Sequence, residues 1–130
     1  MGSLQMKTSC FKYYKGEDGV AICIYPPADW TGCRYPALEP DRQTFYAVKA
    51  HQINNEQFEK LYREQTLSRL DPKEIYNLFK HNVLLCWELP GEPCHRRIIA
   101  KWIEENLHIE VPEWDPSQEH KKSNNTTALF

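Results

Sequence analysis

One short segment, residues 86–97 (CWELPGEPCHRR), holds most of the side chains that could perform a reaction. A proline-glycine turn leads there into a helical pattern, so Cys94 and His95 should lie at a helix start. Unpaired backbone N–H groups at a helix start attract an anion, and Arg96 adds a guanidinium suited to phosphate or carboxylate. The same positive end would lower the pKa of Cys94. His95 could shuttle a proton, and Glu88 could hold His95, pair with Arg96 or act as a base.

The same residues also fit structural roles. A cysteine at a helix start is often a small buried apolar residue, so Cys94 could belong to the core. Cys86 and Cys23 lie in apolar runs and are expected in the core. Arg96 could simply bridge to Glu88. The chain has no P-loop, GxGxxG or serine elbow, and alanine stands where the CX5R spacing of thiol phosphatases requires arginine.

The cysteine pattern argues against both disulfides and zinc. Five cysteines, an odd number, occur without a visible secretory leader, which favours free thiols in a reducing cytosol. No CxxC pair is present, whereas structural zinc sites bring their ligands in close pairs. We therefore expect no metal and no cofactor. A metal-dependent hydrolase that uses Cys86, Cys94 and His95, together with Cys33, stays open as a third interpretation.

Composition limits the class of protein. The 130 residues are 41% hydrophobic and 26% charged, which suits one globular domain. The net charge of -2 argues against a general nucleic-acid coat protein. A local basic patch could still make nucleic acid a substrate. That patch would comprise Lys12, Lys15, Arg34, Arg96 and Arg97. The mean hydropathy of -0.69 and the lack of a long apolar run predict no membrane span.

Apolar runs of strand length predict the sheet. Residues 20–25 and 83–88 are apolar on both faces and predict central parallel strands, and residues 7–14 predict a further strand. The proline-rich segment 26–40 predicts an ordered loop over the strand ends, where Trp30 and Tyr35 would stack on a ring and Arg34 could bind an anion.

Capping signals predict the helices. We expect a short helix at 41–50 and a second that Asn54 caps, with glutamine three residues on. Asp71 and Pro72 predict the third start, and a last helix should run from 94 to 107. Strand, helices, strand, helix is the order of a small three-layer α/β domain with a mostly parallel sheet and crossover helices. Ligands bind beyond the carboxyl ends of strands in such sheets.

The domain boundaries follow from composition. Residues 1–5 (MGSLQ) look like a cloning remnant before a natural start, and residues 6–111 should form a single α/β domain. Residues 112–130 are polar and predict a disordered tail.

The segments IYPPADW, YPALEP, LSRLDPKEIYNLF and VLLCWELPGEPCHRRIIAKWI resemble the family called domain of unknown function 488, over about residues 7–107. The most specific part is its CxExPGxxCHR box. That box is matched here by Cys86, Glu88, Pro90, Gly91, Cys94, His95 and Arg96. The resemblance implies a compact cytosolic α/β domain of bacteria, archaea or phages, without an assigned activity. The family's arginine before YPP is Ile24 here, and if that arginine binds an anion, this chain has lost one ligand or supplies it from Arg34.

These features predict a cytosolic domain that binds a phosphorylated or nucleoside-like ligand at the helix start and could hydrolyse it or transfer a group. The predicted site residues are Arg96, Arg34, Trp30 and Tyr35 for binding, and Cys94, His95 and Glu88 for catalysis. The alternative is a non-catalytic interaction protein with an aromatic patch at Trp30, Tyr35 and Trp114, or a phage protein that sequesters a nucleotide.

Overall fold

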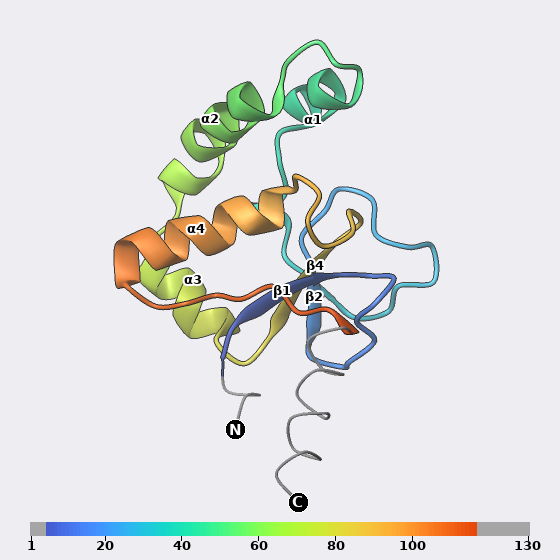
Figure 1. Ribbon diagram of the computed structural model, residues 1–130, viewed down its shortest axis with the longest axis vertical. Coiled ribbons are helices and arrows are strands. Elements are labelled where there is room, and N and C mark those ends of the chain that lie inside the picture. The colour runs from blue at the N-terminus through green and yellow to red at the C-terminus, as the bar shows by residue number, and fades with distance from the viewer. Residues whose placement is uncertain (1–4, 117–130) are drawn as a thin grey trace, which may run out of the picture.

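The computed structural model describes residues 5–116 of the chain. Four parallel strands form one sheet in the order β1-β4-β2-β3 (Figure 1). The strands are β1 (Lys7–Cys10), β2 (Gly19–Ala21), β3 (Cys33–Arg34) and β4 (Val83–Cys86). The two apolar runs predicted as central strands are neighbours, with Val20 opposite Leu84. The predicted α/β fold with a parallel sheet is confirmed.

Helices connect and cover these strands. They are α1 (Arg42–Lys49), α2 (Asn55–Gln65), α3 (Pro72–Phe79) and α4 (His95–Leu107). The first three separate β3 from β4, and α4 follows β4. Asn54 and Gln57 form the predicted capping box, and Asp71 caps α3 with Pro72 in its first turn. These starts are readable from sequence because donor and acceptor lie within one helical turn.

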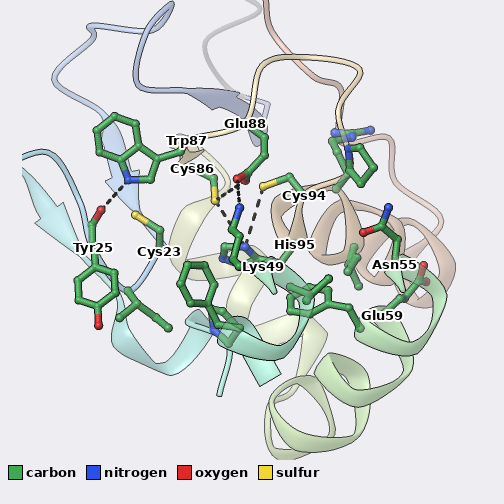
Figure 2. Close-up of a pocket in the computed structure, with 18 of the residues that line it drawn as sticks. Cys23, Tyr25, Lys49, Asn55, Glu59, Cys86, Trp87, Glu88, Cys94 and His95 are labelled. Carbon is green, nitrogen blue, oxygen red and sulfur yellow. Dashed lines mark hydrogen bonds and ion pairs between the residues drawn. The ribbon is translucent and has the colours of Figure 1, made fainter. Parts of the chain in front are cut away.

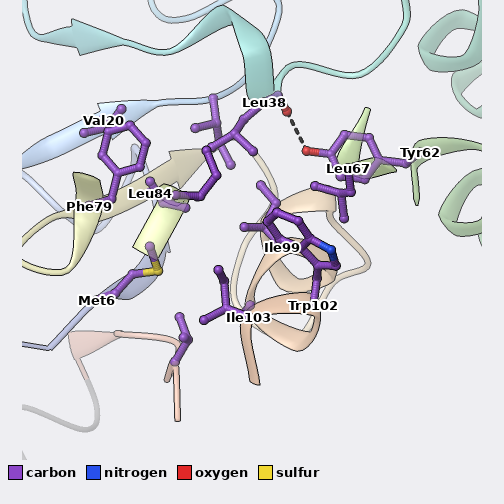
Figure 3. Packing of buried hydrophobic residues seen from close by; sticks show 14 of the residues in the cluster. Met6, Val20, Leu38, Tyr62, Leu67, Phe79, Leu84, Ile99, Trp102 and Ile103 are labelled. Carbon is purple, nitrogen blue, oxygen red and sulfur yellow. Dashed lines mark hydrogen bonds between the residues drawn. The ribbon is translucent and has the colours of Figure 1, made fainter. Parts of the chain in front are cut away.

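The main core lies between one face of the sheet and the helices (Figure 3). Val20 and Leu84 point to this side and share a buried cluster with Ile99 of α4. Tyr62 of α2 is buried in the same cluster, and its hydroxyl donates to the Leu38 carbonyl at 2.6 Å. A buried tyrosine hydroxyl needs such a partner. The bond anchors α2 to the loop that precedes α1.

The opposite face of the sheet packs against loop residues. Ala21 and Leu85, each one position on from Val20 and Leu84, point to this side and cluster with Phe11. Trp30 packs edge-to-face on Phe11, with ring centroids 5.3 Å apart. Side chains in a strand alternate between the two faces, so each central strand is buried on both sides. The loops after β1 and β2 supply this second cover.

Two segments differ from the sequence predictions. Cys33–Arg34 lies within the predicted loop but pairs with β2 as strand β3. Residues 112–116 were predicted as the start of a disordered tail, yet they run beside β1. The N–H of Trp114 donates to the carbonyl of Thr8 at 2.8 Å. Main-chain hydrogen bonds do not depend on the type of side chain. The polar composition of residues 112–116 therefore gave no sign that this segment is ordered beside β1.

Both ends of the chain lie partly outside the described residues. These ends are residues 1–4, most of the predicted cloning remnant, and residues 117–130, most of the predicted tail. At Gln5, the first described residue, the side-chain amide donates a hydrogen bond to the Glu110 carbonyl at 3.1 Å. From residue 5 to residue 116, no helix is both long and apolar enough to cross a bilayer.

Candidate functional site

A pocket of about 870 Å³ lies where β2 and β4 end at their carboxyl edges. Its lining comes from the residues that follow those strands, from α1 and α2, and from the first turns of α4. Figure 2 shows the side chains that project into it. The location agrees with the rule that ligands of open parallel sheets bind beyond the carboxyl ends of the strands.

The turn between β4 and α4 builds one end of this pocket. Gly91 has a φ of +93°, which favours glycine because it lacks a Cβ. The N–H of Glu92 donates to the Leu89 carbonyl at 3.0 Å and closes the turn. The chain reverses there, so that Cys94, the N-cap residue of α4, comes back beside Cys86 at the end of β4.

Two thiols and one imidazole converge as a result, and we call Cys86, Cys94 and His95 the thiol–imidazole cluster. The sulfur of Cys86 lies 3.5 Å from Nδ1 of His95, and that of Cys94 lies 4.0 Å from the same nitrogen (Figure 2). All three ligand atoms lie within 4.8 Å of one another. Cys86 and His95 are buried, whereas Cys94 is partly exposed, and all three line the pocket.

The hydrogen bond of the other ring nitrogen fixes the tautomer of the neutral His95 imidazole. Nε2 lies 2.6 Å from the carbonyl oxygen of Ile22. A carbonyl only accepts, so Nε2 carries a proton and donates it. In neutral imidazole this leaves Nδ1 with its lone pair directed at the two thiols. The residue that follows β2 therefore orients the side chain that begins α4.

Glu88 lies beside the thiol–imidazole cluster. Its Oε1 accepts from the Cys86 thiol at 3.5 Å, and its Oε2 accepts from the Lys49 ammonium at 3.0 Å. Burial by itself would raise the pKa of Glu88, but hydrogen bonds from Cys94 and Lys49 outweigh it and lower that pKa to about 2. Glu88 is therefore a carboxylate that accepts hydrogen bonds, and it is a weak base at neutral pH.

Two thiols of the pocket, those of Cys94 and Cys23, have raised pKa values and are therefore not activated. Burial, followed by the hydrogen bond with the Cys86 thiol, raises the pKa of Cys94 well above that of an ordinary thiol. The prediction that the helix start lowers this pKa was wrong, because desolvation outweighs the partial charge of the helix. Burial also raises the pKa of Cys23, which lines the same pocket, to about 12.

Aromatic rings and basic groups form the rest of the lining. Tyr25 and Trp87, about half exposed at 49% and 51%, stand at the pocket with Phe45 of α1. The indole N–H of Trp87 donates to the Tyr25 carbonyl at 2.6 Å, which fixes the two residues to each other. Lys49, Arg97 and Lys101 also line the pocket, against the carboxylates of Glu59 and Glu88.

The two arginines predicted to bind the ligand lie outside this lining. Arg96 is fully buried and forms an ion pair with Glu113 at 2.6 Å. Arg34 donates to the Ile24 carbonyl at 3.1 Å and pairs with Glu39 at 3.2 Å. Of the predicted catalytic and binding residues, the pocket brings together Cys94, His95 and Glu88.

The aromatic residues predicted to bind a ring are engaged elsewhere. Trp30 packs on Phe11, and its indole N–H donates to the Cys33 carbonyl. Tyr35 packs edge-to-face on Phe79. Trp114, part of the aromatic patch of the interaction alternative, packs edge-to-face on another ring, that of Tyr14.

Several residues of the pocket were not predicted from the sequence, among them Trp87, Tyr25 and Lys49. Trp87 stands within the CWE segment and could have been found there, because its neighbours Cys86 and Glu88 were already singled out. Tyr25 ends the second apolar run and gave a weaker signal of the same kind. Lys49 gave none, because it meets Glu88 only through the placement of α1 across the strand ends.

The exposures of the five free cysteines predict an order of alkylation. In the folded protein, iodoacetamide should modify Cys33 first, because it is exposed and the others are buried or partly buried. Cys94 should react slowly, since burial and the raised pKa both reduce its accessible thiolate. Peptide mass spectrometry against time measures both rates, and a denatured sample should react at every cysteine. Rapid modification of Cys94 in the folded chain would contradict this prediction.

No protein-family model matches the chain, and neither a curated protein nor a solved structure matches it. The resemblance to the domain of unknown function 488 stays a prediction.

Proposed function

We propose that the protein binds a phosphorylated or nucleoside-like small molecule in the pocket. The observation that supports this most is the combination, in one cavity, of aromatic walls and a polar end where Cys94, His95 and Glu88 converge. A site of this kind, mostly apolar with a few convergent polar groups, is the usual form of a small-molecule site. Hydrolysis or group transfer would take place at the end formed by the thiol–imidazole cluster.

The size and walls of the pocket suit a ring. About 870 Å³ falls within the range of roughly 300–1,000 Å³ that small-molecule sites occupy. Tyr25 and Trp87 offer aromatic faces at the pocket, and stacking on such faces accepts any nucleobase. They take the role that the sequence assigned to Trp30 and Tyr35.

The charges of the pocket support an anionic group on the ligand. Two lysines line it, Lys49 and Lys101, beside the carboxylates of Glu88 and Glu59, whereas the guanidinium of Arg97 donates to Thr8 and to the Val111 carbonyl. Lys49 lies closest to the thiol–imidazole cluster, because its ammonium donates to Glu88 at 3.0 Å. A phosphate that enters beside Lys49 would gain a charge-assisted hydrogen bond.

We also propose a reducing, cytosolic location. All five cysteines of the chain lie in the described residues and are free, although the chain carries enough thiols for two disulfides. Free thiols persist in a reducing compartment.

Titration with ligands of graded chemistry tests this function. We expect nucleoside monophosphates to raise the melting temperature in a concentration-dependent way, with about 2.7 kcal/mol of stabilisation at 100 times Kd. Nucleosides should bind more weakly, because they lack the group that Lys49 would contact. Lys49→Met should reduce the preference for the phosphate and keep the aliphatic stem. Lys73→Met, at an exposed position of α3, is the matched control and should change nothing.

Calorimetry gives Kd for each pair of protein and ligand. The proposal fails if nucleoside monophosphates, nucleosides and inorganic phosphate all leave the melting temperature unchanged at millimolar concentration. Equal affinity of Lys49→Met and the original chain for the monophosphate would remove Lys49 from the site.

A further inference from the structure

The spacing of the thiol–imidazole cluster matches the ligand set of a tetrahedral metal ion. Zinc binds sulfur at about 2.3 Å and nitrogen at about 2.0–2.1 Å, so ligand atoms of a tetrahedral site lie about 3.5–3.8 Å apart. The sulfurs of Cys86 and Cys94 lie 3.5 and 4.0 Å from Nδ1 of His95. With all three atoms within 4.8 Å of one another, side-chain shifts of about 1 Å or less would complete the geometry.

The neutral imidazole of His95 has the tautomer and the orientation that a metal requires. Its Nε2 donates to the Ile22 carbonyl, and its Nδ1 lone pair faces both sulfurs. Metal-ligating histidines almost always donate their other ring N–H to a carbonyl, a carboxylate or water, which fixes the tautomer and the ring orientation. One lone pair can accept from only one thiol at a time, whereas a metal ion would bond to all three atoms together.

We infer that Cys86, Cys94 and His95 bind a divalent zinc ion at the inner end of the pocket. Thiolate and imidazole ligands favour zinc over hard cations such as magnesium or calcium. Two thiolates neutralise the two charges of the ion, which suits a largely buried site. Lys49 and Glu88 neutralise each other beside it, at 3.0 Å.

The cavity makes this an open site. All three ligands line the pocket, so an ion held by them would be accessible from the space where the ligand would enter. Three protein ligands with an open fourth position are typical of catalytic zinc, which lowers the pKa of its bound water to about 7. An ion held by these residues would supply Lewis-acid activation of a water, whose oxygen would bond to an electrophilic phosphorus or carbon. The leaving group would depart with the electron pair of the broken bond and take up one proton of the water, and the other proton would stay on the new hydroxyl. This use of the ion rests on the proposed function, whereas binding of the ion does not.

Metal binding by the full chain tests the inference without any organic ligand. The protein is stripped with a chelator under reducing conditions and titrated with zinc against a chromophoric competitor. We expect one equivalent of zinc per chain. Cobalt should occupy the same site and give thiolate-to-cobalt charge-transfer absorption together with the visible bands of a tetrahedral ion.

Two variants make the test specific. Cys94→Ser should weaken zinc binding by more than the roughly 10–100-fold that loss of an outer-shell partner costs. It should also reduce the charge-transfer absorption. Serine is a preferred N-cap residue, so this variant should keep α4 and the fold, which circular dichroism verifies. Cys23→Ser is the matched control, since Cys23 is a buried thiol of the same pocket outside the thiol–imidazole cluster. It should bind zinc like the original chain.

The inference is overturned if the original chain binds no zinc, or if Cys94→Ser binds it with unchanged affinity and spectrum. The zinc titration and the ligand titration test the two proposals on this pocket independently. Nucleoside monophosphate binding without zinc binding would overturn the metal site alone. Zinc binding without any response to the three ligand classes would overturn the proposed function alone.

Discussion

Arg96→Ala is expected to lower the free energy of unfolding by about 3–5 kcal/mol, the cost of breaking a buried ion pair. The guanidinium of Arg96 has no exposed surface, and its Nε and Nη2 both donate to the carboxylate of Glu113. Glu113 in turn accepts from the hydroxyl of Thr8 on β1. Removal of Arg96 would leave a cavity and a carboxylate without its cation. Arg96 therefore holds residues 112–116 against α4 and the sheet, in place of the anion-binding role that its position predicted.

Urea denaturation measures this loss, with Arg69→Ala as the matched control. Arg69 is exposed at the end of a short 3-10 turn, so its replacement should change the stability by no more than about 0.5 kcal/mol. Glu113→Gln should also destabilise the chain, because it leaves the buried guanidinium without its counter-charge. A folded Arg96→Ala protein of unchanged stability would return Arg96 to the list of candidate ligand residues.

Trp87→Ala is expected to weaken binding of a nucleoside monophosphate about 5–150-fold, whereas Trp30→Ala should leave it unchanged. Stacking of a base on an aromatic ring contributes about 1–3 kcal/mol, and each 1.4 kcal/mol is tenfold in Kd. Trp87 lines the pocket with half of its surface exposed. Trp30 does not line the pocket, and its indole N–H donates to the Cys33 carbonyl.

The two tryptophans are a well-matched pair for calorimetry. Both pack on Phe11, at centroid distances of 5.1 Å for Trp87 and 5.3 Å for Trp30, so both substitutions remove a similar ring contact. A loss of affinity in Trp87→Ala alone would therefore reflect the lost contact with the ligand and not the lost packing on Phe11. Equal losses in both variants would point to a general effect on the fold, and a loss in Trp30→Ala alone would move the ring site to the loop after β2.

The sequence alone determined the elements that depend on neighbours along the chain. The capping box of Asn54 and the Asp71–Pro72 start were readable because their bonds close within one turn. The two apolar runs were readable as central strands because burial on both faces requires apolar residues at every position. The box from Cys86 to His95 was readable as a site because the turn that joins its two ends is short.

Only the tertiary structure decided which charged and aromatic side chains face the pocket. Arg96 meets Glu113, 17 residues away, and Lys49 meets Glu88, 39 residues away. Contacts between side chains so far apart in the sequence depend on how the helices pack on the sheet. The residue types alone do not determine these contacts. Trp30 and Trp87 look alike in the sequence, yet one fills the second face of the sheet and the other opens onto the cavity.

The same reason applies to the thiols. Cys94 and His95 stand together in the sequence, but Cys86 reads as an ordinary core residue of a strand. The reversal at Gly91 places the sulfur of Cys86 3.5 Å from Nδ1 of His95, so that the three side chains form one cluster. The residue types therefore determined which reactions the site could perform. The turn that returns the start of α4 to the end of β4 determined how its side chains are arranged.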